Sequence, residues 1–259
     1  MPYFDIRVAI FLLAAAFGNY AESPQPGNDM VSTTSLATEI VASAVATPSP
    51  EPRVTTGDIA ASAMSAFDSA AWDFAAIGAV DRDVFSMALN SAEKAVARGE
   101  ATASTLTVID FSVPSTERRM FVYDLRSRAL LFAEHVSHGR NSGGNVPTMF
   151  SNEPESFKSS IGLYRTGEGY FGKHGYSLRL DGLEKGFNDR ARVRAIVIHG
   201  ADYVNGATAK LQGRLGRSLG CPALRPEIAA KVIDTVKDGG LVFAYYPDPA
   251  WLTSSTYLN

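Results

Sequence analysis

A single cysteine, Cys221, could act as a nucleophile because of where it lies in the sequence. It sits in the glycine-rich stretch GRLGRSLGCPALRP, between a predicted strand that reads RAIVIHG and a predicted helix that begins near Pro226. Unpaired backbone N–H groups and the positive end of a helix dipole favour a thiolate and can hold an oxyanion. The pattern therefore indicates a reactive thiol, with a small buried core residue as the alternative.

His199 could be the base that such a thiol needs. It follows the apolar run at residues 195–198 and precedes Gly200, so its imidazole lies where a buried strand meets a loop. A thiol that attacks a carbonyl needs a base to form the thiolate and an acid to protonate the leaving amine, and histidine does both near neutral pH. We expect His199 to face Cys221; the alternative is a strand-end histidine bonded to the backbone.

Short runs of β-branched and aromatic residues predict a main domain that is mostly sheet. A hairpin is expected where MFVYDL is followed closely by ALLFAEHVS, whereas the many glycines between residues 162 and 186 predict turns. The predicted strands read TLTVIDFS, MFVYDL, ALLFAEHVS, RAIVIHG and LVFAYYP.

Helices are expected on either side of these strands in the sequence. Asp81 can cap a helix that reads DVFSMALNSAEKAVARG, within a small helical segment at residues 58–100. One clear late helix has Pro226 and Glu227 in its first turn, carries an apolar stripe and stops before Gly239. The predicted fold class is β-rich α+β: a β-sandwich or mixed sheet with one clear late helix, preceded by the small helical segment.

The ends of the chain differ in composition from its main part. Residues 1–21 contain the apolar run VAIFLLAAAF after Arg7 and are expected to form a signal peptide or an N-terminal anchor. Residues 22–57 are rich in Ser, Thr, Pro and Ala, which predicts a disordered linker. The main domain is expected at residues 104–248, with a tail at 249–259. We expect a periplasmic or secreted protein of the cell envelope.

Composition excludes several classes of protein. Hydrophobic residues make up 46% and charged residues 20% of the 259 residues, which excludes a wholly disordered chain and a polytopic membrane protein. The net charge of -3 gives no basic field for nucleic acid, so nucleic acid is not an expected partner, and a membrane is expected only through the N-terminal anchor. One cysteine excludes an intramolecular disulfide framework and a cysteine-rich metal cluster. The oligomeric state does not follow from the sequence.

Several motifs resemble one family in their order along the chain. HGADYV is followed by SLGC, whose Ser218 lies nineteen residues after His199, and this resembles the L,D-transpeptidase signature of His-Gly and then Ser/Thr-His-Gly-Cys. The longer runs FVYDLRSRALLFAEHVSHGRNSGG, GKHGYSLRLDGLEKGFNDRARVRAIVIHGADYV and GRSLGCPAL resemble the murein L,D-transpeptidases, a divergent branch of the YkuD-like enzymes. The resemblance covers about residues 104 to 248.

The resemblance implies a β-rich cysteine enzyme that acts on peptidoglycan stem peptides without a cofactor or a metal. Cys221 would attack a carbonyl at the L-centre of a dibasic residue, expel the terminal D-amino acid and form a thioester. An amine of a second stem would then give a crosslink, whereas water would make the enzyme an L,D-carboxypeptidase. The resemblance assigns His199 as base and acid, Gly220 to the oxyanion loop and Ser218 to holding that loop.

Two positions depart from the broad pattern, and others are candidates for binding substrate. Leu219 replaces the expected second histidine, and Ala223 replaces an Asn or Arg. Stem peptides carry carboxylates, so arginines near Cys221 could bind them, although solvated loop charges are the alternative. Two histidines that precede glycine-rich turns could line the substrate groove. The residues expected to bind substrate are Gly200, His138, His174, Arg217 and Arg225.

Two other functions remain as alternatives. The HVSH motif could supply a zinc hydrolase with His135 and His138, but a spacing of three in a strand puts the two rings on opposite faces. A cell-wall binding module that has lost activity would keep the fold and lose the thiol or its partner, and this chain has both. The sequence therefore favours the cysteine enzyme.

Overall fold

The computed structural model describes residues 66–102 and 104–259. The predicted signal peptide or anchor and the predicted linker lie outside the described residues, as does the start of the predicted helical segment. Among the described helices, none is long and apolar enough to cross a membrane. The proposed domain boundaries stay predictions.

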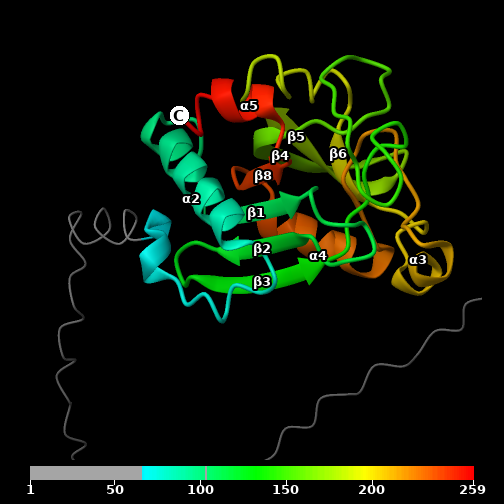
Figure 1. Cartoon of the computed structure of the whole chain (residues 1–259), viewed down its shortest axis with the longest axis horizontal. Helices are drawn as coiled ribbons and strands as arrows, with labels where there is room; N and C mark the ends of the chain where they lie inside the picture. Colours follow the sequence, from blue (N-terminus) through cyan, green and yellow to red (C-terminus); the bar gives the residue numbers. More distant parts are fainter. Residues whose placement is uncertain (1–65, 103) are drawn as a thin grey trace, which may run out of the picture. The chain divides into compact units, whose positions relative to one another are not determined.

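The described chain folds around one mixed sheet of eight strands in the order β3-β2-β1-β8-β4-β5-β6-β7, which confirms the predicted β-rich α+β class (Figure 1). The β1·β8 and β6·β7 pairs are parallel and the other neighbours are antiparallel. The predicted hairpin of β2 and β3 is confirmed. The strands are β1 (Thr105–Asp110), β2 (Met120–Asp124), β3 (Ala129–Glu134), β4 (Gly162–Gly172), β5 (Gly175–Gly182), β6 (Val197–Gly200), β7 (Ala223–Leu224) and β8 (Leu241–Tyr245).

The prediction of turns between residues 162 and 186 is wrong, because most of this stretch forms the β4–β5 hairpin. The two strands pair from Tyr164↔Gly182 to Gly172↔Gly175, with a register shift between Thr166 and Gly169. Gly169 is required for packing and not for a turn, since a Cβ there would lie 2.6 Å from the Tyr176 hydroxyl oxygen. Glycine in this hairpin therefore makes room for side chains that cross the strands.

The helices begin where the sequence places capping groups. Asp81 accepts hydrogen bonds from the backbone N–H groups of Asp83 and Val84, as predicted for the first turn of α2 (Arg82–Ala97). The predicted late helix is α4 (Pro226–Val236), with Pro226 and Glu227 in its first turn. A 3-10 turn, η1 (Ser69–Ala71), precedes α2, while α3 (Gly206–Gln212) follows β6 and α5 (Pro249–Ser254) follows β8.

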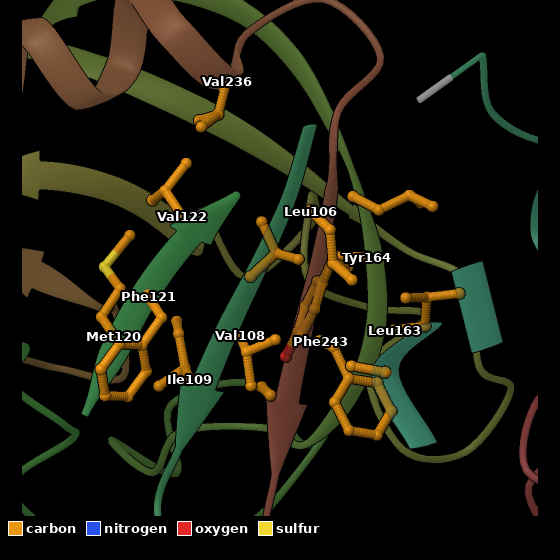
Figure 2. Packing of buried hydrophobic residues seen from close by; sticks show 14 of the residues in the cluster. Leu106, Val108, Ile109, Met120, Phe121, Val122, Leu163, Tyr164, Val236 and Phe243 are labelled. Atoms are coloured by element: carbon orange, nitrogen blue, oxygen red, sulfur yellow. The ribbon is translucent and has the colours of Figure 1, made fainter. Parts of the chain in front are cut away.

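Helices α2 and α4 pack on opposite faces of the sheet. On one face, Tyr123 of β2 contacts the Phe85 ring of α2, with 4.8 Å between the ring centroids. The neighbouring Val122 points to the other face, where Val236 of α4 lies beside it (Figure 2). Burial on both faces explains why β1 is buried along its whole length instead of alternating.

The C-terminal residues also pack on the sheet. Trp251 of α5 is fully buried and donates a hydrogen bond from its ring N–H to the Glu184 carboxylate at 2.8 Å. The other oxygen of Glu184 accepts from the backbone N–H of Leu163 in β4. Through this carboxylate, α5 helps to fix the base of the β4–β5 hairpin.

Candidate active site

Cys221 lies in a loop two residues before β7 and is half-buried. Its sulfur accepts a hydrogen bond from the backbone N–H of Val197 at 3.5 Å and donates one to the carbonyl of Ala195 at 3.6 Å. Burial raises the pKa of the thiol, although the Val197 N–H and the nearby Arg194 charge act in the opposite direction. The thiol therefore needs a base to ionise at neutral pH.

His199 is the last residue but one of β6 and is buried. In the β6·β7 register it pairs with Ala223, two residues after Cys221. Its Nδ1 lies 2.9 Å from the carbonyl oxygen of Gly200. Burial lowers the pKa of His199, the Gly200 carbonyl raises it and the neighbouring His174 lowers it. In the described chain no hydrogen bond joins this imidazole to the sulfur of Cys221; both instead bond to the backbone of one short stretch, residues 195–200.

Residues 216–222, the Cys221 loop, are held by the Ser218 side chain. The Ser218 hydroxyl donates to the carbonyl of Cys221 at 2.6 Å and accepts from the backbone N–H of Gly220 at 3.0 Å. Its own backbone N–H donates to the carbonyl of His138, and its carbonyl accepts from the N–H of Arg140. The hydroxyl thus closes the loop around Cys221 with two hydrogen bonds.

A second serine, Ser159, ties the same loop to the rest of the domain. Its hydroxyl donates to the carbonyl of Gly220 and accepts from the backbone N–H of Gly139, each at 3.0 Å. Gly220 has φ 129°, in the region that favours glycine, and a Cβ there would lie 2.8 Å from the carbonyl oxygen of Lys158. No motif in the sequence pointed to Ser159, because its partners lie about twenty residues before it and sixty after it.

His174 covers His199 from the tip of the β4–β5 hairpin. The two rings stack with 4.5 Å between their centroids and an interplanar angle of 24°. His174 is exposed, whereas His199 is only 2% exposed. The structure thus brings the predicted groove residue His174 directly onto the imidazole at the site.

His138 takes a different place from the one that a groove residue would need. It is buried, and its Nδ1 lies 2.8 Å from a guanidinium nitrogen of Arg119, which is fully buried. Burial and the charge of Arg119 lower the pKa of His138 to about 4, so its ring is neutral at pH 7. The backbone of His138 contacts the Cys221 loop, whereas its ring lies in the interior. His135, the other half of the HVSH motif, has its ring against the carbonyl of Thr116.

Two arginines expected to bind substrate are engaged with the protein. Arg217 donates to the carbonyls of Arg140 and Gly143 and so supports the Cys221 loop. Arg225 forms a bidentate ion pair with Glu134, with both N–O distances 2.9 Å. Arg225 also lines a pocket of about 340 Å³ with Asp202 and Asn205 at the carboxyl ends of β6 and β7. Both guanidinium groups therefore already bind protein oxygens in this structure.

The other residues near Cys221 are small or exposed. Gly200 packs against α4: a Cβ there would lie 3.2 Å from the Cβ of Ala229 and 3.3 Å from Pro226. Leu219, where the family pattern has a histidine, is 57% exposed, so it does not pack under the Cys221 loop. Ala223 is fully buried and cannot contact a ligand at the surface. Of the two histidines in the broader family pattern, the structure therefore has only His199 beside the Cys221 loop. The ring of His174 stacks on the ring of His199.

A protein-family model for the L,D-transpeptidase catalytic domain matches residues 77–245, which is more than half of the 259 residues. The chain belongs to this family. The matched range includes α2 and all eight strands and thus the whole site. No curated protein matched in the sequence search.

Solved L,D-transpeptidases are similar to this chain at low identity. The enzyme from Mycobacterium smegmatis is 16% identical, with a TM-score of 0.36, over 56% of this chain and 59% of that chain. L,D-transpeptidase 1 from Mycobacterium tuberculosis is 15% identical, with a TM-score of 0.32, over 55% and 62%. The enzyme from Stackebrandtia nassauensis is 11% identical, with a TM-score of 0.34, over 63% and 68%. This chain thus covers less than two thirds of the two mycobacterial proteins.

Proposed function

We propose that the protein is an L,D-transpeptidase in which Cys221 forms a thioester with a peptidoglycan stem peptide and His199 moves the protons. The observation that carries the proposal is the shared geometry of β6 and β7. The Cys221 sulfur accepts from the backbone N–H of Val197 on the strand that carries His199, and His199 pairs with Ala223, two residues after Cys221. Family membership supports the same assignment.

The hydrogen bond of His199 to Gly200 selects the tautomer that a base needs. A carbonyl oxygen can only accept, so Nδ1 carries the ring proton and Nε2 keeps its lone pair. Gly200 thereby orients the base, as a third group orients the histidine in other nucleophile–base pairs. The burial that lowers the pKa of His199 keeps the ring neutral and able to accept the Cys221 proton.

The reaction then proceeds in balanced steps. The Cys221 proton passes to Nε2 of His199 while the sulfur bonds to the stem carbonyl carbon, and the amine of the D-amino acid leaves with that proton. In the next step, the acceptor amine loses a proton to His199 as it attacks the thioester, and the sulfur leaves as the thiolate. Among the loop amides described, Gly220 N–H is engaged by Ser218, so we assign the oxyanion to the N–H of Cys221.

Hydrolysis of the same thioester is the second candidate. The thioester intermediate is common to both reactions, and water in place of the acceptor amine gives an L,D-carboxypeptidase. The pocket of about 340 Å³ beside Arg225 is a candidate position for the acceptor stem, and its polar lining suits a stem carboxylate or amine. Peptidoglycan lies outside the cytoplasm, so we also propose that residues 1–21 direct export and that residues 22–57 link this segment to the domain.

The test is mass spectrometry of purified stem tetrapeptide incubated with the protein. Released D-alanine with dimers supports the transpeptidase, and released D-alanine with tripeptide alone supports the carboxypeptidase. Cys221→Ala should abolish both products and leave the fold intact, since the sulfur makes only two long hydrogen bonds. Unchanged turnover in Cys221→Ala, with the far-UV circular dichroism of the wild type, would place the chemistry elsewhere.

A further inference from the structure

Arg194 is held directly below the Cys221 loop, and neither the sequence motifs nor the family signature points to it. One terminal nitrogen donates to the carbonyl of Ser151 at 2.7 Å and to the hydroxyl of Ser160. The other donates to the Ser156 hydroxyl at 3.1 Å and to the carbonyl of Lys158 at 2.7 Å. These four acceptors fix the plane of the guanidinium.

All four of these acceptors are neutral. In the described part of the chain Arg194 takes part in no ion pair, whereas the neighbouring Arg192 pairs with Asp181 and Glu168. Burying a cation without a counterion costs free energy, and burial accordingly lowers the pKa of Arg194. Arg194 remains charged at neutral pH, so the fold keeps an uncompensated positive charge at this place.

The groups around Arg194 connect it to Cys221. A Cβ on Gly220 would lie 3.5 Å from a guanidinium nitrogen and 2.8 Å from the Lys158 carbonyl oxygen to which that nitrogen donates. The next residue in the chain, Ala195, accepts the Cys221 hydrogen bond through its carbonyl. The guanidinium thus lies next to Gly220, the residue before Cys221, and the backbone of Arg194 continues directly into the residue that binds the sulfur.

We propose that Arg194 is a positioning residue for Cys221: it fixes the backbone under Gly220 and supplies the positive charge that a Cys221 thiolate requires. The broader family pattern has a second histidine beside the cysteine, but in this chain that position is the exposed Leu219. Here the positive charge comes instead from Arg194, in the segment before β6. The inference rests on the proposed function, in which Cys221 reacts as a thiolate that a nearby positive charge stabilises.

Other titratable groups face this region and must be accounted for. Tyr164 of β4 lies near Arg194, and burial raises its pKa well above the usual range. Tyr203 lies near Cys221, and burial raises its pKa to about 12. Both phenols are neutral below pH 9, and Glu153 interacts with Arg194 at longer range. His174 faces the site from the β4–β5 turn, and His199 from β6. The fixed charge in this set is that of Arg194.

The test uses the rate at which iodoacetamide alkylates Cys221, which needs no substrate and reports one site because the chain has one cysteine. The rate follows the thiolate fraction. Removing a positive charge disfavours the thiolate, so Arg194→Met should slow alkylation at pH 7 by about tenfold for each unit by which the thiol pKa rises. The two rates should converge at high pH, and Arg194→Lys should recover part of the loss at pH 7.

A second variant, Ser156→Asp, tests the charge while the Arg194 side chain is kept. The Ser156 hydroxyl now accepts a hydrogen bond from the guanidinium at 3.1 Å. Ser156→Asp puts a carboxylate in this place and so neutralises the charge of Arg194. Like Arg194→Met, it should slow alkylation at pH 7 and shift the pH dependence of the rate to higher pH. The uncharged Ser156→Asn should leave this pH dependence unchanged. Arg192→Met is the matched control, because this arginine lies in the same segment and is paired with carboxylates at the surface.

The outcomes separate this inference from the proposed function. A wild-type profile in both Arg194→Met and Ser156→Asp overturns the role of the charge, even if the protein crosslinks stems. If alkylation of Arg194→Met is slower by the same factor at every pH, the role of the charge is also overturned, because displacement of the Cys221 loop alone would slow the reaction in this way. A shifted profile in a protein that does not release D-alanine supports the charge at Cys221 and removes the transpeptidase function.

Discussion

The Cys221 loop and the tip of the β4–β5 hairpin both border His199, and they are built in opposite ways. Side-chain hydrogen bonds hold the loop: Ser218 and Ser159 bond to its backbone, and Arg217 ties it to neighbouring carbonyls. At the hairpin tip Phe171 is 85% exposed, and His174 contacts the site by ring stacking. One border of the site is fixed, and the other is an exposed cover.

The difference assigns separate tasks to the two borders. Reacting groups must be held to within a fraction of an ångström, which the buried hydrogen bonds of the loop can do. The tip contacts the site through the stacking of an exposed ring, and an exposed contact of this kind breaks at a low free-energy cost, which suits the admission of a long substrate. Changes on the fixed side should therefore affect the chemical step, and changes at the tip should mainly affect the local environment of His199.

The largest effect is expected at the group between the two borders. His199→Ala removes the base, so acylation of Cys221 at neutral pH should fall by about 10² to 10⁴-fold. Raising the pH should recover part of the rate, because thiolate then forms without the base. The measurement is acylation by a β-lactam of the carbapenem type, followed from about pH 5 to 9 by mass spectrometry. An unchanged profile would mean that His199 is not the partner and would make His174 the next candidate.

A smaller effect is expected on the fixed side. Ser218→Ala leaves the carbonyl of Cys221 and the N–H of Gly220 without their partner, and such a loss costs about 1–3 kcal/mol. The free energy of unfolding in urea should fall by that amount, and acylation should slow. Ser127→Ala, in an exposed turn, is the control and should leave both unchanged. Faster or equal acylation in Ser218→Ala would show that the loop needs no such restraint.

The smallest effect is expected at the tip. His174→Ala removes a neighbour that lowers the pKa of His199 and also exposes that ring to water, and both changes raise the pKa. More His199 is then protonated in mild acid, so acylation at pH 6 should slow, by up to about threefold for a rise of half a pKa unit. At pH 8 the rates should agree. The control is Lys173→Ala in the same exposed turn. A loss as large at pH 8 as at pH 6 would contradict the idea of a cover.

The sequence was sufficient for elements whose signals are local. The Asp81 cap, the β2–β3 hairpin and the start of α4 at Pro226 each depend on a few neighbouring residues, and all are confirmed. The sequence does not reveal the β4–β5 hairpin, because glycines as frequent as those between residues 162 and 186 are typical of turns. Gly169 instead accommodates the Tyr176 ring across the hairpin, which no local pattern reveals.

The site could be predicted in part for the same reason. His199 and Cys221 stand out by residue type and by their positions at a strand end and in a loop, and His199 does pair with Ala223, two residues after Cys221. Arg194 and Ser159 act through partners that are distant in sequence, the former across some forty residues to Ser151, so no spacing marks them. The site roles of Arg217 and Arg225 stay predictions, and in the structure both guanidinium groups already bind protein oxygens.

The place of β8 in the sheet has a consequence for the order in which the protein can fold. The strands β3-β2-β1 lie on one side of β8 and β4-β5-β6-β7 on the other, so the two groups of strands meet at β8. Among the described strands, β8 is also the last in the sequence. A growing chain therefore carries two sheet edges, those of β1 and β4, that β8 does not join until residues 241–245 have been made. For a chain that we propose is exported, a sheet that stays incomplete until β8 is made suits passage through a translocation channel in an unfolded state.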